Sequence, residues 1–129
     1  MGEKDLQQLY LVKKQLERTY KTKVIPCKTI RDRNNVALSS RNLLLNKSSL
    51  VIAAKIYKKL VSIKKKIKNK KNILSFLNHQ KKELKNSYKI KIDYLELRNI
   101  NNLKISNTKK NSRLFIAYYL NNVRLIDNL

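Results

Sequence analysis

The sequence predicts an α+β fold, in which the end of an α/β unit is followed by a small module of helices packed on an antiparallel sheet. Three patterns support this prediction. Residues 5–30 show helical spacing of apolar side chains and then a short β-branched run. Residues 46–86 return to helical spacing, and from Tyr88 the apolar spacing changes to two. We place the boundary after residue 38, which gives predicted domains at 1–38 and 39–129.

The first part is predicted to contain one helix and one strand. The predicted helix covers Asp5 to Tyr20 and has apolar residues at helical spacing. These are Leu6, Leu9, Tyr10, Val12 and Leu16. Lys23 to Ile30 is short, β-branched and interrupted by Pro26, which favours a strand near a sheet edge or entering a loop. Arg31 to Asn35 is polar and predicts a turn, in which Asn34-Asn35 tolerates left-handed backbone angles.

The two helices of the second part are predicted from apolar side chains at helical spacing, and the first of them also from a cap. Asn46 or Ser48 can cap a helix that runs to about Lys68 and has lysines on its other face. A further helix is predicted from roughly Asn72 to Asn86.

The strands of the second part follow these helices. One strand begins near Tyr88, and its alternation slips after Tyr94, which indicates a bulge or the end of the strand. Ser112 to Leu120 and Val123 to Ile126 predict two more strands, joined by a tight turn at Asn121-Asn122.

The net charge of +23 allows two interpretations. A field of this size attracts polyanions such as nucleic acid. However, the chain has 24 lysines but only 7 arginines, and lysine has A/T-rich codons, as do the abundant asparagine and isoleucine. The densest run, Lys64 to Lys71, contains no aromatic residue on which a base could stack. We therefore favour solvated lysine faces, and keep a basic nucleic-acid or polyanion binding module as the alternative function.

Composition also limits the compartment and the kinds of site. No apolar run reaches the roughly 18 residues that span a bilayer, so we expect no membrane partner. The single cysteine, Cys27, favours a reducing compartment, and we expect a cytoplasmic protein with Cys27 buried. His79 is the only histidine and is expected on the surface or half-buried, so neither a metal cluster nor a histidine-based triad is predicted. Gly2 is the only glycine, which excludes a glycine-rich phosphate loop.

Two clusters could bind an anion. Gly2 to Gln8 places a glycine and a lysine directly before a helix, where backbone N–H groups attract negative charge. Leu38 to Asn42 combines two hydroxyls with a forked guanidinium, which suits a triphosphate or a departing pyrophosphate. Taken separately, each has an ordinary structural explanation: a surface ion pair for the first and a helix cap for the second.

Together, the clusters resemble a family. GEKDLQQL near the start, IRDRNNVALSSRN about thirty residues later and RLIDN at the end are similar to the motifs of the pantothenate synthetases, or pantoate–β-alanine ligases. The order and spacing agree over nearly the whole chain. The resemblance implies the end of a Rossmann-like nucleotidyltransferase domain at 1–38 and a lid domain at 39–129.

The resemblance also implies a reaction. An ATP-dependent ligase would join pantoate to β-alanine through pantoyl adenylate, giving pantothenate, AMP and pyrophosphate, with Mg²⁺ shielding the phosphates. Implied partners are ATP, pantoate, β-alanine, a second copy in a homodimer and a complementary amino-terminal half.

The family's site residues carry over to matching positions. Those implied to contact ATP are Gly2, Glu3, Lys4, Asp5, Ile30, Leu38, Ser39, Ser40 and Arg41. Lys4 and Ser39 to Arg41 would act in catalysis, Ile30 would contact adenine through its backbone, and Gln8 would bind pantoate. No residue of this chain is expected to bind metal.

The chain departs from the family pattern in several places. Asn34-Asn35 replaces the usual Asp-Gly before the loop, and the family's His-x-Gly-His segment has no counterpart. We therefore expect the chain to resemble the carboxy-terminal portion of such a ligase and to be inactive alone. Residues 1–38 would normally pack on a parallel sheet, so we expect this part to be loosely ordered or covered by another chain.

Overall fold

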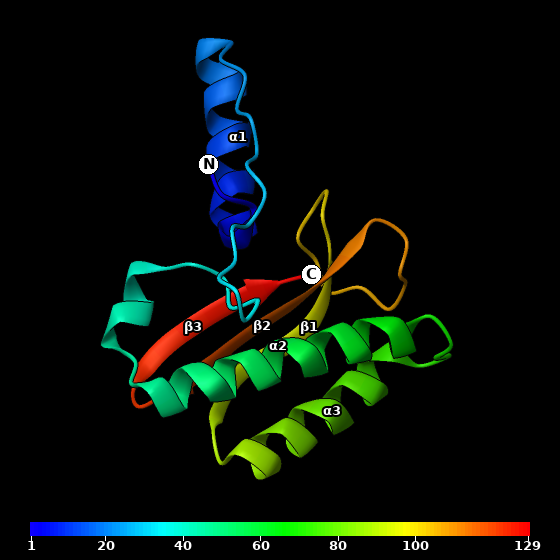
Figure 1. Ribbon diagram of the computed structural model, residues 1–129. Coiled ribbons are helices and arrows are strands. Elements are labelled where there is room, and N and C mark those ends of the chain that lie inside the picture. Colours follow the sequence, from blue (N-terminus) through cyan, green and yellow to red (C-terminus); the bar gives the residue numbers. More distant parts are fainter.

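Two helices pack on one face of a three-stranded antiparallel sheet in the computed structural model, which describes residues 1–129 (Figure 1). The helices are α2 (Lys47–Ile67) and α3 (Ile73–Tyr88), and the strands are β1 (Lys91–Asn99), β2 (Ser112–Leu120) and β3 (Val123–Asn128). The strand order is β1-β2-β3, so β2 is central. The predicted α+β class is confirmed.

Side-chain caps and apolar stripes explain where the two helices form. The Asn46 side chain accepts a hydrogen bond from the backbone N–H of Ser49 at 2.8 Å, which settles the cap of α2. Asn72 caps α3 in the same way, accepting from Ser75 at 3.1 Å. The buried apolar residues of α2 recur every three or four positions and face the sheet. They are Ala53, Ile56, Leu60, Ile63 and Ile67.

The β1 strand contains the predicted irregularity, at a different position. The pairing of β1 with β2 shifts register between Ile92 and Tyr94, rather than after Tyr94. Ile92 is buried before the shift and Leu95 after it, so the extra residue returns the apolar side chains to the core face. Tyr88 is the last residue of α3, so the prediction that it begins the strand was wrong. Lys89 ends the helix with a positive φ of 52°, and the strand starts only after this break.

The turn between β2 and β3 forms as predicted. Asn121 and Asn122 have φ angles of 46° and 64°, which match the right-handed twist of a hairpin. The Asn121 side chain also donates to the Ser49 hydroxyl at 2.8 Å. This hydrogen bond ties the hairpin to the first turn of α2.

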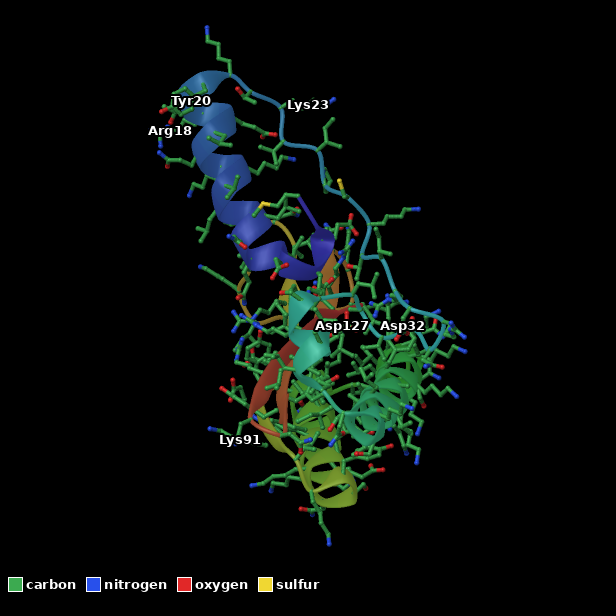
Figure 2. The ribbon with its side chains drawn as sticks, turned by 60° about the vertical axis from the view of Figure 1, so that its left-hand side comes forward. Arg18, Tyr20, Lys23, Asp32, Lys91 and Asp127 are labelled. Carbon is green, nitrogen blue, oxygen red and sulfur yellow. The ribbon has the colours of Figure 1, made fainter.

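The amino-terminal part projects away from the sheet and its helices (Figures 1 and 2). A short 3₁₀ turn, η1 (Glu3–Asp5), leads into α1 (Leu6–Tyr20), and the chain then returns along α1 in an extended segment. Leu9 is the only buried residue of α1. No helix in the structure combines the length and the hydropathy needed to cross a membrane.

Two predictions for this part were wrong. Lys23 to Ile30 does not form a strand, because its only bridge to another segment is a parallel one between Gly2 and Cys27. A β-branched run becomes a strand only where a neighbouring backbone pairs with it, and here no further backbone does. Cys27 is exposed rather than buried. The domain boundary after residue 38 stays a prediction.

Candidate functional site

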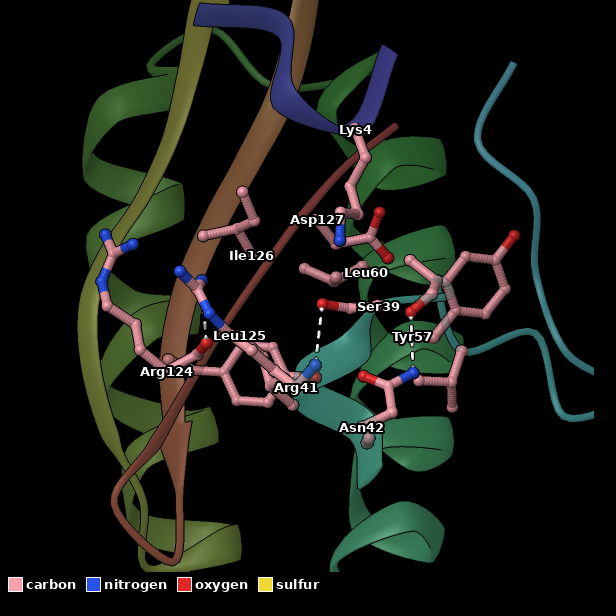
Figure 3. Close-up of a pocket in the computed structure, with 14 residues that line it drawn as sticks. Lys4, Ser39, Arg41, Asn42, Tyr57, Leu60, Arg124, Leu125, Ile126 and Asp127 are labelled. Atoms are coloured by element: carbon pink, nitrogen blue, oxygen red, sulfur yellow. Dashed lines mark hydrogen bonds between the residues drawn. The ribbon is translucent and has the colours of Figure 1, made fainter. Parts of the chain in front are cut away.

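Lys4 is held over the end of β3 by hydrogen bonds to its backbone. The Asn128 side-chain amide donates to the carbonyl oxygens of Glu3 and Lys4, at 2.8 and 2.9 Å. The Glu3 carboxylate pairs with Arg113 of β2 at 3.2 Å. With its backbone fixed, Lys4 extends its side chain into a pocket (Figure 3). Its Nζ donates to the Leu38 carbonyl oxygen at 3.2 Å.

The loop of residues 31–38 forms the next part of the pocket. One Asp32 carboxylate oxygen accepts from the backbone N–H groups of Asn34 and Val36, at 2.8 and 2.9 Å. This Asx turn needs a left-handed residue, and Asn35 has a φ of 65°, as predicted for the Asn-Asn pair. The turn brings the two ends of the loop together, and Leu38 N–H donates to the Ile30 carbonyl at 2.9 Å.

Arg31 anchors this loop to the sheet. Its guanidinium forms two hydrogen bonds with the carboxylate of Asp127 on β3, at 2.7 and 2.8 Å, and lies over the Tyr57 ring of α2 at 4.4 Å. Burial lowers the pKa of Arg31, but the hydrogen bonds and charge of Asp127 outweigh it and raise the pKa overall. Burial also raises the pKa of the neighbouring Tyr118 hydroxyl, and the charge of Asp127 adds to this.

The segment after the loop places a serine and an arginine at the pocket. Ser39 caps the 3₁₀ turn η2 (Ser40–Leu44), its hydroxyl accepting from the Arg41 N–H at 3.3 Å. The Arg41 guanidinium donates to the Arg124 carbonyl at 3.4 Å and makes no ion pair. Asn42 donates to the Ala37 carbonyl at 3.1 Å, which leaves its buried Oδ1 as an acceptor with no donor.

The positive charges around the pocket divide into two kinds. Arg31 is paired with Asp127, and Arg124 is paired with Asp93 at 2.8 Å. The hydrogen bond that Arg124 donates to Asp93 raises the pKa of Arg124, although burial opposes the shift. Lys4 and Arg41 also line the pocket, but neither has a carboxylate partner. The pocket therefore presents two uncompensated positive charges, which suits an anion.

The structure brings together some of the predicted site residues. Lys4, Ser39 and Arg41 line one pocket although they are far apart in the sequence (Figure 3). A second pocket adjoins it, sharing Lys4 and Asp127, and Gln8 and Asp5 line this second pocket.

The other predicted residues lie around the pocket rather than in it. Gly2 pairs with Cys27, and the Leu38 side chain is exposed while its carbonyl receives Lys4. The Ser40 side chain is exposed and makes no hydrogen bond. Ile30 is 71% exposed, and its backbone N–H has no partner.

Sequence reasoning missed Arg31, Arg124 and Asp127 as parts of the site. Arg31 and Asp127 are 96 positions apart, so no local spacing connects them. One signal was available: Asp127 directly follows the predicted strand from Val123 to Ile126, in a chain with only eight acidic residues. Such a carboxylate needs a partner when it is buried.

The side chains present do not form a metal site. No group of three or more His, Cys, Asp or Glu side chains is arranged to hold an ion. Asp127, which lines the pocket, is paired with Arg31, and Asp93 is paired with the pocket residue Arg124.

Comparison with known proteins identifies the family. The model of the family described as pantoate-beta-alanine ligase matches residues 1–129. The chain belongs to this family. The resemblance inferred from the motifs is thereby confirmed.

Relatives within the pantoate–β-alanine ligase family are about twice as long as this chain. The pantothenate synthetase of Flavobacterium psychrophilum is 36% identical over 132 residues, which cover 99% of this chain and 46% of that protein. The pantothenate synthetase of Cytophaga hutchinsonii is also 36% identical, with 99% and 47% covered. The chain thus spans about half the length of the curated relatives it matches.

Solved structures of the family show the same fold. The pantothenate synthetase of Thermus thermophilus superposes with a TM-score of 0.86 at 27% identity, covering all of this chain and 48% of that one. The pantoate–β-alanine ligase of Francisella tularensis superposes with a TM-score of 0.67 at 35% identity, covering 99% and 41%. That ligase is described as a complex with β,γ-ATP and β-alanine.

Proposed function

We propose that this chain forms one side of the active site of an ATP-dependent ligase that condenses pantoate with β-alanine. The observation that carries the proposal is the pair of uncompensated positive charges, Lys4 and Arg41, that converge on one pocket from the two family motifs. The ligand-bound Francisella tularensis relative supports ATP and β-alanine as ligands.

The proposed reaction has two steps. A carboxylate oxygen of pantoate attacks the α-phosphorus of ATP, and the bond from that phosphorus to the pyrophosphate oxygen breaks. The amine of β-alanine then attacks the acyl carbon, the bond from that carbon to the AMP oxygen breaks, and the amine loses a proton. Catalysis of this kind depends on positioning the reactants and stabilising phosphate charge.

Residues of this chain have distinct proposed roles in the first step. Lys4 and Arg41 bind the phosphate oxygens, with the Ser39 and Ser40 hydroxyls as further donors. The unpartnered backbone N–H of Ile30 donates to adenine. Gly2, Glu3, Asp5 and Leu38 shape the nucleotide side of the pocket. The Gln8 side chain binds pantoate in the adjoining pocket.

We propose that no residue of this chain binds magnesium, which the pairing of Asp93 and Asp127 with arginines supports. We therefore derive no step through the ion, which would accompany ATP as part of the substrate.

We further propose that these 129 residues do not form pantoyl adenylate alone and act with the amino-terminal half of a full-length family member. The test measures AMP formation from ATP, pantoate and β-alanine, with the chain alone and with such a half added. We expect AMP only in the mixture. AMP from the chain alone would contradict this proposal, and an inactive mixture would count against complementation.

Variants test the proposed phosphate contacts directly. Hydrogen bonds to charged groups contribute about 1.5–3 kcal/mol, so Lys4→Ala and Arg41→Ala should each weaken ATP binding by roughly ten- to a hundred-fold. Binding is measured by NMR titration, which detects weak affinities. Lys58→Ala on α2 and Arg18→Ala near the end of α1 remove the same charges outside the pocket and should change the affinity little. Equal effects of pocket and control variants would refute the assignment.

A lysine-lined groove favours a second candidate function, polyanion binding. Two hollows between α3 and β1 share Lys85 and Lys91. The lysines that line them are Lys81, Lys82, Lys85, Lys89 and Lys91. Nucleic-acid binding there should weaken steeply with salt and should be reduced by a Lys85→Gln/Lys91→Gln double variant. Oligonucleotide binding that is absent at physiological salt would exclude this function.

A further inference from the structure

The last two residues of β3 contact both segments that form the pocket. We propose that Asp127 and Asn128 are positioning residues, which fix the Lys4 segment and the Ser39–Arg41 segment relative to each other. The inference rests on the proposed function, since it concerns how the ATP-binding groups are held. Neither residue is assigned a contact with the reacting atoms.

Asn128 fixes the Lys4 segment. It is 4% exposed, and its side-chain amide uses both hydrogens, one on the Glu3 carbonyl and one on the Lys4 carbonyl. Its side-chain oxygen accepts from Arg113 at 3.2 Å, and Arg113 in turn pairs with the Glu3 carboxylate. The Glu3–Lys4 segment is therefore attached to the sheet at three points, which are its two backbone carbonyls and the Glu3 carboxylate.

Asp127 fixes the loop that leads to Ser39. It is 7% exposed, and its two oxygens receive the Arg31 guanidinium. Arg31 also donates to the Asn35 carbonyl at 3.2 Å, so its side chain connects two residues of the same loop. The Arg31 guanidinium pairs with the Asp127 carboxylate of β3 and lies over the Tyr57 ring of α2. It thereby links the loop to both elements.

Strand geometry explains why two adjacent residues can serve two segments. Successive side chains of a strand point to opposite faces of the sheet. Asp127 points with Leu125 toward α2, where the loop lies, and Asn128 points to the other face, where η1 lies. One rigid strand end thereby sets the distance between Lys4 and the loop, whose Leu38 carbonyl accepts the Lys4 amine.

Charge and positioning predict opposite effects for one substitution. Asp127 lines the pocket proposed to bind a triphosphate, so removing its negative charge should tighten ATP binding if charge alone mattered. If Asp127 acts by holding Arg31 and the loop, the same change should weaken binding. Asp127→Asn keeps the side-chain shape and removes the charge.

The first test is the ATP affinity of the Asp127→Asn chain, measured by NMR titration. We expect affinity about ten-fold weaker than for the unchanged chain, a loss typical of misplaced contacts to a charged group. Glu96→Gln is the matched control, because Glu96 pairs with Arg98 on β1 outside the pocket. Its ATP affinity should not change. Unchanged or tighter binding by Asp127→Asn would overturn the proposal.

A gentler variant covers the possibility that Asp127→Asn unfolds. Arg31→Lys preserves the charge but loses the two-point contact with Asp127. Charge alone predicts no change in ATP affinity for this variant, whereas positioning predicts a several-fold loss. The double variant Arg31→Lys/Asp127→Asn should lose no more affinity than the weaker-binding of the two single variants, because both act through one contact. Additive losses would show that Asp127 does not act through Arg31.

Amide hydrogen exchange separates this inference from the proposed function. If the unchanged chain binds no ATP, the function proposed for the pocket fails, and exchange alone decides the inference. Asp127→Asn should speed exchange at Val36 and Leu38, and Asn128→Asp should speed it at Glu3 and Asp5, whose amides bond to Cys27 and Gly2. Glu96→Gln should change none of them. Unaltered exchange in both β3 variants would refute the positioning roles.

Discussion

Shortening Ile56 to alanine tests whether residues 39–129 fold as a unit of their own. Ile56 lies on the sheet-facing side of α2 and is completely buried. The substitution removes about three carbon groups, each contributing about 0.8 kcal/mol of burial free energy, or roughly 2.4 kcal/mol together. The unfilled cavity adds to this, so the free energy of unfolding should fall by about 3–4 kcal/mol.

Leu11→Ala is the comparison on the projecting helix. Leu11 is 63% exposed on α1, so its truncation should change the free energy of unfolding by no more than about 0.5 kcal/mol. Urea unfolding followed by circular dichroism gives both values, and amide exchange assigns them to segments.

The exchange pattern is the decisive measurement for Ile56→Ala. Amides of α2, α3 and the sheet should lose protection together, because they share the core around Ile56. Amides of α1 should keep the protection they have in the unchanged chain, since no residue of α1 belongs to that core. If α1 loses protection in step with α2, the chain unfolds as one unit and the boundary after residue 38 is refuted.

Two further predictions concern the sheet. The hydrogen bond from Arg124 lowers the pKa of Asp93 in the folded chain. The pair therefore stabilises the fold at pH values above the unfolded-state pKa of about 3.9. This stabilisation is lost as the pH falls through the lower folded-state pKa. Asp93→Asn should therefore lower the urea midpoint at pH 6 and have little effect near pH 2; an equal effect at both would contradict this. At the hairpin, Asn122 has a φ of 64°, which alanine adopts less readily than asparagine or glycine. Asn122→Ala should therefore lower the free energy of unfolding by about 1 kcal/mol, and Asn122→Gly by less. Equal urea midpoints for the two variants would contradict this.

The parts of the fold that depend on local chemistry could be predicted from the sequence. Asn46, Asn72 and the Asn121-Asn122 turn act through hydrogen bonds and backbone angles within a few residues. The strand predicted at Lys23 to Ile30 failed for the opposite reason. Its β-branched residues favour extended backbone, but pairing needs a neighbouring strand, and that depends on the tertiary arrangement.

The same distinction applies to the candidate site. Lys4, Ser39 and Arg41 were selected as candidates because their two motifs together resemble those of a family, and the structure brings these three residues to one pocket. Asp127 was missed because its partner, Arg31, lies 96 positions away. Asp127 is buried only because β3, the loop and α2 pack together, and the sequence alone does not predict that packing.

Ion pairing also explains which pocket variant is the more informative. Unpaired lysines are the rule in this chain, because 31 basic residues meet only eight acidic ones. The lysine pairs that exist join exposed side chains at 3.8 and 3.9 Å, and such pairs contribute little.

Arginines behave differently. Four of the seven are paired with carboxylates at 2.6–3.2 Å. Among them are Arg124, which lines the pocket, and Arg31, whose partner Asp127 lines it. An unpaired Lys4 is therefore what composition alone would produce, whereas an unpaired Arg41 beside two paired arginines is not. For this reason a loss of ATP binding in Arg41→Ala supports the proposed function more strongly than the same loss in Lys4→Ala.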